Sequence, residues 1–286
     1  MSTLKAWENY KIIDAGNKEK LEQLDDILIV RSEPVALFNK EKPDLWHDVH
    51  AVFKVSAKNK GQWQIHKPLP QSIILKYRDW QFISALGKFK HIGIFPEQAQ
   101  NWDWMQNIIH ESQRTHLKVL NLFAYTGGAT VACASMVGVE EVVHVDAAKK
   151  MVQWAKDNVK LNNLTHQRVR FLVDDVMKFV EREIRRKRQY DIIILDPPSY
   201  GRGPNNQLWK IEDHLIPLLH KLKQLLSDQP LFLLLNSYST HLSAMMIQNM
   251  MMDVFDQGSL QVNEIGIPIS NSKKILPTGV TGKWTP

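Results

Sequence analysis

The residues best suited to chemistry stand in four short segments in the second half of the chain. A glycine pair, Gly127-Gly128, follows an apolar run, and glycines at such a turn let a bound molecule approach the backbone closely. Asp146 lies 18 residues after Gly128, a spacing at which a carboxylate can accept hydrogen bonds from both hydroxyls of a ribose. Asp174-Asp175 and Asp196-Pro197-Pro198 also end apolar runs. Each segment alone could be structural, since acidic residues often cap helices, but together they indicate a site for a nucleotide-like ligand.

The glycine pattern restricts which nucleotide-like ligand can bind. The G-x-G-x-x-G pattern of dinucleotide-binding proteins is absent, because Phe123 and Tyr125 stand where small residues are needed. No Lys-Ser or Lys-Thr pair follows the glycines, which excludes a P-loop for nucleoside triphosphates. A ligand with an adenosine ribose and no pyrophosphate fits the pattern, and S-adenosylmethionine is such a ligand.

Strands that alternate with helices are expected to position these four segments. The apolar pattern predicts strands at 118–125, 140–146, 169–175, 190–196 and 231–236, with helices at 129–138, 147–163 and 176–184. Such alternation gives right-handed crossovers and a mainly parallel sheet covered on both faces. In such sheets, ligands bind beyond the carboxyl ends of the strands, where the four segments stand.

The end of the chain predicts a different kind of pairing. Residues 260–269 and 273–284 read as two strands joined by a turn near Asn271, and they form an antiparallel hairpin at one edge of the sheet. The predicted fold is therefore a Rossmann-like, doubly wound α/β sheet of seven strands, mainly parallel, with an antiparallel C-terminal hairpin.

The N-terminal part of the chain has a different pattern of apolar and turn residues. Short β-like segments separated by turn residues occur at 26–30, 50–55, 72–77 and 80–86. They predict a small β-rich domain over residues 1–89, followed by the α/β domain over residues 90–286. The alternative is an N-terminal extension that packs as an edge of the main domain.

Four motifs in this order resemble the class I S-adenosylmethionine-dependent methyltransferases. VLNLFAYTGGAT at 119–130 is similar to the first motif of the group that methylates cytosine C5 in large-subunit ribosomal RNA. HVDAAKKMVQWAKDN, FLVDDVMKFV and YDIIILDPPSYGRG resemble the second, third and fourth motifs. GIFPEQ at 93–98 resembles a segment that touches the cofactor from its other side in this group. The resemblance covers residues 90–286.

The resemblance implies a role for each matching residue. Asp146, with Ala147 beside it, would hold the ribose, and Asp175 would accept the adenine amino group, although the sequence leaves Asp174 open for that role. Asp196 would also contact the cofactor near its sulfonium methyl. The methionine part of S-adenosylmethionine would be surrounded by Phe123, Ala124, Tyr125, Thr126, Gly127 and Gly128, with Gln98 on the other side. The catalytic residues implied are Asp196, Pro197, Pro198 and Tyr200.

The chain departs from this group at its catalytic cysteine. Cytosine C5 becomes nucleophilic only when a thiolate adds to the ring. The two places where the group carries that cysteine read Asn236-Ser237-Tyr238-Ser239 and Asp196-Pro197-Pro198-Ser199 here. The single cysteine, Cys133, lies in an apolar helix and is expected to be a core residue. We therefore predict direct methyl transfer to a nitrogen or oxygen, without a covalent enzyme–RNA intermediate.

The charge of the chain indicates an anionic partner. There are 36 Lys and Arg against 30 Asp and Glu, a net charge of +6. This balance and the resemblance predict methylation of a base in structured RNA. A small-molecule or protein methyltransferase, and a non-catalytic RNA-binding module, stay open as alternatives. Arg185 to Arg188 could contact RNA phosphates or simply complement the end of their own helix.

The remaining features of the sequence mainly exclude other kinds of protein and site. One cysteine excludes an internal disulfide, which makes the cytosol the default compartment. No apolar run approaches the length that spans a membrane, and no targeting segment is visible. His47 and His50 lack the companions of a metal site. Residues 199–207 are either a substrate lid or an irregular crossover, and the oligomeric state stays open, a homodimer included.

Overall fold

The computed structural model describes residues 7–55, 61–87, 90–203 and 207–286. The chain forms two compact units. The first consists of Met1–Gln100 and Gly266–Thr278, and the second of Asn101–Ile265 and Gly279–Pro286. The division into domains between residues 89 and 90 concerns parts that fold independently, and it stays a prediction.

The first unit is rich in strands. Its five-stranded sheet has the order β1-β2-β3-β4-β5, in which β3 and β4 are parallel and the other neighbours antiparallel. Its strands are β1 (Tyr10–Gly16), β2 (Glu19–Leu24), β3 (Ile27–Ser32), β4 (Ala51–Val55) and β5 (Gly61–Ile65), and a separate hairpin joins β6 (Ile73–Tyr77) to β7 (Trp80–Ser84). The sequence pattern located β3, β4, β6 and β7 but missed β1, β2 and β5.

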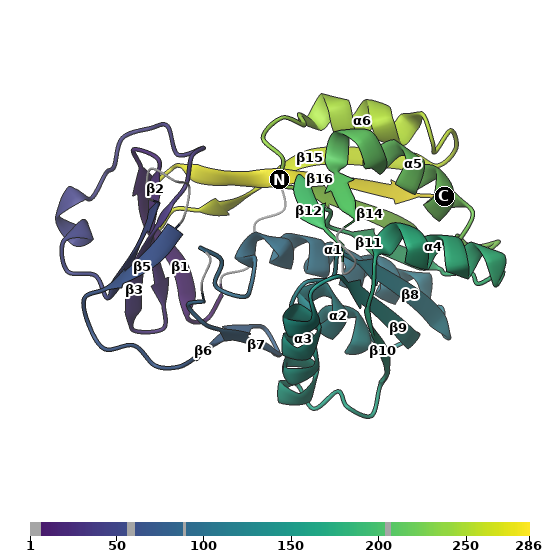
Figure 1. The fold of residues 1–286 in the computed structure, drawn as a ribbon, viewed down its shortest axis with the longest axis horizontal. Helices are drawn as coiled ribbons and strands as arrows, with labels where there is room; N and C mark the ends of the chain where they lie inside the picture. The colour runs from purple at the N-terminus through teal and green to yellow at the C-terminus, as the bar shows by residue number, and fades with distance from the viewer. Residues whose placement is uncertain (1–6, 56–60, 88–89, 204–206) are drawn as a thin grey trace. The chain divides into compact units, whose positions relative to one another are not determined.

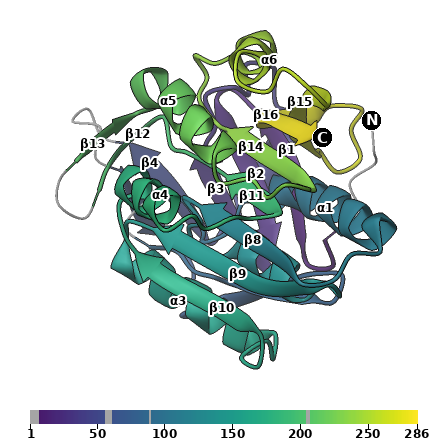
Figure 2. The ribbon, with the colours of Figure 1, turned by 90° about the vertical axis from the view of Figure 1, so that its right-hand side faces the viewer.

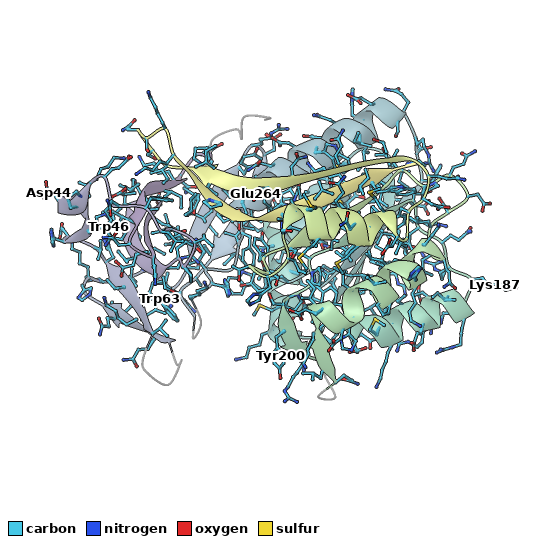
Figure 3. All side chains as sticks on the ribbon, turned by 90° about the horizontal axis from the view of Figure 1, so that it is seen from above. Asp44, Trp46, Trp63, Lys187, Tyr200 and Glu264 are labelled. Atoms are coloured by element: carbon cyan, nitrogen blue, oxygen red, sulfur yellow. The ribbon has the colours of Figure 1, made fainter. Side chains whose placement is uncertain are left out.

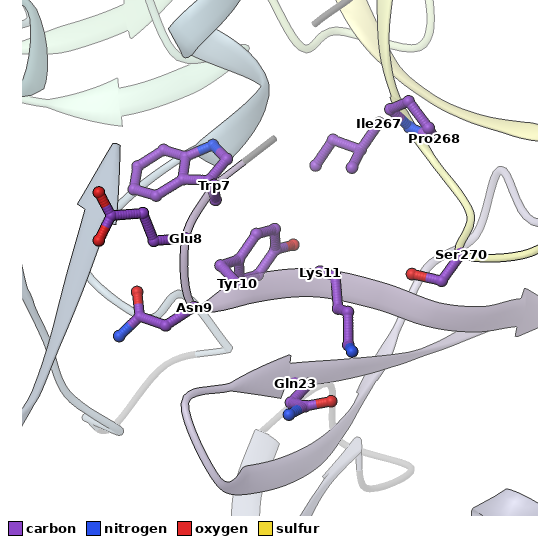
Figure 4. A pocket seen from close by; sticks show the side chains of 9 residues that line it. All are labelled: Trp7, Glu8, Asn9, Tyr10, Lys11, Gln23, Ile267, Pro268 and Ser270. Carbon is purple, nitrogen blue, oxygen red and sulfur yellow. The ribbon is translucent and has the colours of Figure 1, made fainter. Parts of the chain in front are cut away.

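A buried ion pair stabilises this sheet. Arg31 on β3 donates to Glu22 on the adjacent β2 from Nη2 at 2.6 Å, and Tyr10 on β1 donates to the same carboxylate at 2.7 Å. A cavity of about 360 Å³ lies beside β1, with the rings of Trp7 and Tyr10 and the side chain of Ile267 among its walls (Figure 4).

The second unit contains the predicted α/β sheet. Its seven strands have the order β10-β9-β8-β11-β14-β16-β15, and the first five are parallel (Figure 1). These strands are β8 (Leu117–Leu122), β9 (Val139–Asp146), β10 (Arg168–Val173), β11 (Ile192–Leu195), β14 (Phe232–Ser237), β15 (Ser259–Pro268) and β16 (Ile275–Thr285). Strand β16 is antiparallel to β14, so the predicted fold class, with its C-terminal hairpin, is confirmed.

Helices cover both faces of this sheet (Figure 2). One face packs on α4 (Val176–Arg185), α5 (Ile211–Lys223) and α6 (Ala244–Met252), through alternating strand residues such as Leu233 and Leu235. The other face carries α1 (Ala99–Ser112), α2 (Gly128–Ala134) and α3 (Lys149–Leu161). Strand order reverses between β8 and β11, so a ligand site is expected at the carboxyl ends of these two strands.

Two local predictions need adjustment. The strand predicted to continue to Tyr125 ends at Leu122, because the next residues turn into the left-handed region. The segment predicted as a lid or irregular crossover contains a short hairpin of β12 (Tyr200–Arg202) and β13 (Leu208–Lys210), and residues 204–206 lie outside the described residues.

Candidate active site

The loop after β8 has an unusual backbone. Phe123, Tyr125 and Gly127 alternate with ordinary residues and have φ values of 53°, 50° and 83°. The left-handed region costs a non-glycine residue about 1–2 kcal/mol, so two such residues in one loop need support from their surroundings. Strain of this kind, at the point where strand order reverses, is typical of a ligand-binding loop.

Close packing fixes this loop against α3. A Cβ added to Gly127 would lie only 2.8 Å from the Cβ of Ala155, so the backbone approaches α3 too closely for a side chain. The buried Asn158 of α3 donates to the carbonyl oxygen of Thr126 at 2.8 Å, and Ala124 N donates to Val145 O at 3.1 Å. The loop is therefore preorganised on both sides.

Asp146, at the end of β9, supports the loop after β8 by a hydrogen bond to its backbone. Its Oδ2 accepts a hydrogen bond from Tyr125 N at 2.8 Å, and its Oδ1 accepts one from Ala148 N at 2.8 Å. Burial raises the pKa of the Asp146 carboxyl, and the two backbone hydrogen bonds oppose that change. Each oxygen keeps a second lone pair, so the carboxylate can still accept hydrogen bonds from a ligand.

A chain of buried polar side chains lies beneath the loop. Asn121 Nδ2 donates to Thr130 Oγ1 at 2.9 Å, and this hydroxyl lies 2.8 Å from Nδ1 of His144. A hydroxyl oxygen has two lone pairs and one proton, so this contact fits either tautomer of a neutral imidazole. Burial lowers the pKa of His144 to about 3, in agreement with a neutral ring. Sequence reasoning missed this chain, although Asn121 and His144 are polar residues inside apolar strands.

The two acidic residues after β10 have different partners. Asp174 forms an ion pair with Arg182 and accepts a hydrogen bond from Asp175 N at 2.9 Å. Asp175 caps α4, since its Oδ1 accepts from Lys178 N at 3.0 Å. Its other oxygen, Oδ2, lies beside Gly203, 2.8 Å from where a Cβ would stand.

Asp196 stands at the carboxyl end of β11, directly beside the loop. Its backbone N donates to Leu122 O at 3.3 Å, and its Oδ1 accepts a hydrogen bond from Asn236 Nδ2 at 3.2 Å. The indole of Trp209 donates to Pro198 O at 2.7 Å, and its ring centroid lies 4.8 Å from that of Phe123. Backbone and side-chain contacts thus hold the Asp196-Pro197-Pro198 segment next to the loop after β8.

The structure brings most, but not all, of the predicted site residues together. Phe123 to Gly128, Asp146, Ala147 and Asp196 to Pro198 lie together through the contacts above. Tyr200 is on β12 and is 57% exposed. Gln98 belongs to the other compact unit, in the short helix Pro96–Gln98, so its role stays a prediction.

Cys133 is poorly suited to nucleophilic attack. It is fully buried in α2, and burial raises the pKa of its thiol to about 12. A thiol with such a pKa is almost entirely protonated near neutral pH. This agrees with its predicted place in the core.

The basic run at the end of α4 pairs partly with acids. Arg186 lies 3.0 Å from Glu183 and Arg188 lies 2.8 Å from Glu141, and both carboxylates are buried. Figure 3 shows Lys187 at the tip of this unit, far from Tyr200. Ion pairing within the unit explains these two arginines, and contact with RNA phosphates stays a prediction.

Two features are absent from the described residues. No group of three or more His, Cys, Asp or Glu side chains there could hold a metal ion. No helix in the same residues is long and apolar enough to cross a membrane.

Comparisons with known proteins agree on one family. Residues 49–235, more than half of the chain, match the model of a family described as S-adenosylmethionine-dependent methyltransferase. The crystal structure of a SAM-dependent methyltransferase from Agrobacterium tumefaciens is 35% identical and superposes with a TM-score of 0.92, covering 99% of this chain and 92% of that one.

Two further matches are more distant. Ribosomal RNA large subunit methyltransferase K/L of Pseudoalteromonas translucida is 30% identical over 220 residues, which are 76% of this chain and only 28% of that protein. A putative methyltransferase complexed with SAH is 17% identical, with a TM-score of 0.72 over 97% of this chain and 75% of that one, and this likeness supports the fold alone.

Proposed function

The chain belongs to the S-adenosylmethionine-dependent methyltransferases, and from this premise we propose that it methylates a base of structured RNA by direct transfer. The net charge of +6 supports an anionic substrate. The Pseudoalteromonas relative is named for ribosomal RNA, which supports RNA in particular. The cytosol, where such RNA is found, is the compartment we propose.

The residues of the site fit the cofactor. The left-handed loop of Phe123, Tyr125 and Gly127 presents backbone rather than side chains, as a close-fitting ligand requires. Asp146 offers acceptor lone pairs to the ribose hydroxyls. Asp175 is the better candidate of its pair for the adenine amino group, since Asp174 is engaged by Arg182.

Asp196 would act on the methyl acceptor. When bound, S-adenosylmethionine supplies an electrophilic methyl group on a sulfonium. The acceptor nitrogen or oxygen of the base forms the new bond to that methyl as the methyl–sulfur bond breaks. Asp196 orients the acceptor by accepting a hydrogen bond from it, and the acceptor's proton leaves to this carboxylate or to water. Pro197, Pro198 and Tyr200 would line the space around the base.

The observation that carries direct transfer is the burial of the only thiol. Cys133 is fully buried, burial raises the pKa of its thiol, and the segment Asn236 to Ser239 at the end of β14 contains no cysteine. Without a thiolate adduct, cytosine C5 is a poor methyl acceptor. An exocyclic amine or a hydroxyl needs only alignment and proton removal.

Labelled-cofactor transfer tests the proposal. The enzyme is incubated with methyl-labelled S-adenosylmethionine and with separated RNA, protein and metabolite fractions, and labelled RNA is digested for nucleoside mass spectrometry. We expect label in RNA, on a nitrogen or oxygen. Label only in protein or in small molecules would overturn the RNA substrate. Cytosine methylated at C5 would overturn direct transfer.

A further inference from the structure

Asn236 lies beside Asp196 because β14 and β11 are neighbours in the sheet. Leu195 of β11 pairs in register with Leu235 of β14, so the next residue of each strand, Asp196 and Asn236, also stand side by side. The Asn236 amide donates to Asp196 Oδ1 at 3.2 Å. Asn236 is 1% exposed, so little water competes for this hydrogen bond.

The other half of the Asn236 amide indicates that this residue is not there for stability. A carboxylate oxygen only accepts hydrogen bonds, so Nδ2 must face Asp196 and Oδ1 must point away. Oδ1 is buried and has no hydrogen-bond partner among the described residues. An unpaired buried oxygen is unfavourable, and a leucine of similar size would match the apolar residues before it, Phe232 to Leu235.

A second orphaned group lies at the same end of β14. The hydroxyl of Ser239 is buried, and within the described part of the chain it too has no partner. Buried polar groups are normally paired, so two such atoms three residues apart at this end of β14 mark a place under functional constraint.

We propose that Asn236 is a positioning residue for methyl transfer. Its amide holds the Asp196 carboxylate in one orientation at the end of β11. The inference rests on the proposed function, in which Asp196 orients the methyl acceptor. It assigns a role to a residue in Asn236 to Ser239, one of the two segments where the resembling enzymes carry a catalytic cysteine.

Two substitutions separate positioning from a merely structural role. Asn236→Leu removes the donor at nearly constant volume, and single-turnover transfer should slow by about 10- to 100-fold, while the dissociation constant of S-adenosylmethionine changes less than about twofold. Asn236→Asp places two carboxylates at hydrogen-bond distance, so they must share a proton. The acidic limb of the pH–rate profile should then move up by about one pH unit or more.

A charge control and an RNA-independent readout complete the test. Asn249→Asp adds the same charge on the exposed surface of α6 and should leave the pH–rate profile unchanged. Carbon NMR follows the titration of the Asp196 carboxyl, identified by its loss in Asp196→Asn. Without the Asn236 donor, the midpoint should rise by roughly half a pH unit or more, because the charged form loses a hydrogen bond.

The two proposals fail in different ways. Wild-type enzyme that transfers nothing to RNA overturns the RNA substrate, whereas the NMR titration still tests the link between Asn236 and Asp196. A folded Asn236→Leu variant with an unchanged Asp196 midpoint overturns the positioning role. So does unchanged single-turnover transfer in that variant, or an unmoved acidic limb in Asn236→Asp.

Discussion

Asp146→Ala is the most direct test of the cofactor site. In the structure this carboxylate accepts two backbone hydrogen bonds at 2.8 Å, from Tyr125 N and Ala148 N. The first of these stabilises the left-handed conformation of Tyr125 in the loop that would surround the methionine part of the cofactor. The substitution therefore removes both a ligand contact and a support of the loop.

The expected loss follows from these contacts. A hydrogen bond to a charged group contributes about 1.5–3 kcal/mol, so loss of the ribose contact should weaken S-adenosylmethionine binding about 10- to 150-fold. Loss of the loop support should also lower the free energy of unfolding. Asp146→Asn should bind almost as weakly as Asp146→Ala, because its amide NH₂ would face the N–H of Tyr125 or Ala148.

Isothermal titration calorimetry with S-adenosylmethionine measures the affinity, and thermal unfolding measures stability. The matched control is Asp157→Ala, which removes an exposed carboxylate from the following helix and should change neither quantity appreciably. Since burial raises the pKa of Asp146, wild-type affinity should fall as the pH is lowered toward that raised value. A folded Asp146→Ala variant with wild-type affinity would refute the assignment of this strand end to the ribose.

Three further predictions concern the residues around the loop. In the folded protein, burial lowers the pKa of His144 from 6.5 to about 3. As the pH falls below about 6.5, His144 is therefore protonated in the unfolded chain but not in the folded one, and the free energy of unfolding decreases. Between about pH 7 and pH 5 this amounts to about 2 kcal/mol, which urea unfolding should detect in the wild type and not in His144→Phe. Cys133→Ala should retain transfer within about twofold, and RNA containing 5-fluorocytidine should not trap the enzyme covalently; a trapped complex would contradict direct transfer. Gly127→Ala should lower the melting temperature and the cofactor affinity, because the residue has φ 83° and no space for a Cβ, whereas Gly87→Ala has open space and should do neither.

The parallel sheet could be predicted because each of its strands and helices is indicated by a short stretch of neighbouring residues. Strands β11 and β14 are almost continuous apolar runs, as strands buried on both faces must be. Strands β8 and β9 are mostly buried but carry polar residues, and β10, at the edge of the sheet, is apolar only toward its end. Helices with clear apolar stripes separate several of these strands. The acidic and glycine residues follow directly from the ends of these runs. Their approximate meeting place is then a consequence of parallel topology.

Strand β2 shows why other elements were missed. Its sequence, EKLEQL, has no β-branched residue and alternates poorly, so it does not indicate a strand. Glu22 is nevertheless fully buried in it, because Arg31 and Tyr10 satisfy its carboxylate from the neighbouring strands. These contacts with Glu22 form only when the three strands are paired, so the sequence of β2 alone does not reveal them.

The loop after β8 and the end of β14 have the same limitation. A pattern of apolar residues could not predict that Phe123 and Tyr125 adopt left-handed conformations, since the support comes from Asp146, 21 residues after Tyr125. The bond between Asn236 and Asp196 joins residues 40 positions apart. The sequence marked Asp196 as a site residue but gave Asn236 no role, and only the order of the strands brings the two into contact.

The first compact unit takes its last segment, Gly266–Thr278, from near the end of the chain, and this affects its synthesis. Ser270 N donates to Ile12 O at 2.9 Å, and Lys274 Nζ lies 2.9 Å from the Glu41 carboxylate. A ribosome produces residues 1–100 long before these partners, so the outer edge of β1 stays unpaired while the chain from β8 to β15 is being made. An exposed strand edge is a hazard for aggregation during that interval. The unit that begins the chain is thus completed only when translation has passed residue 278.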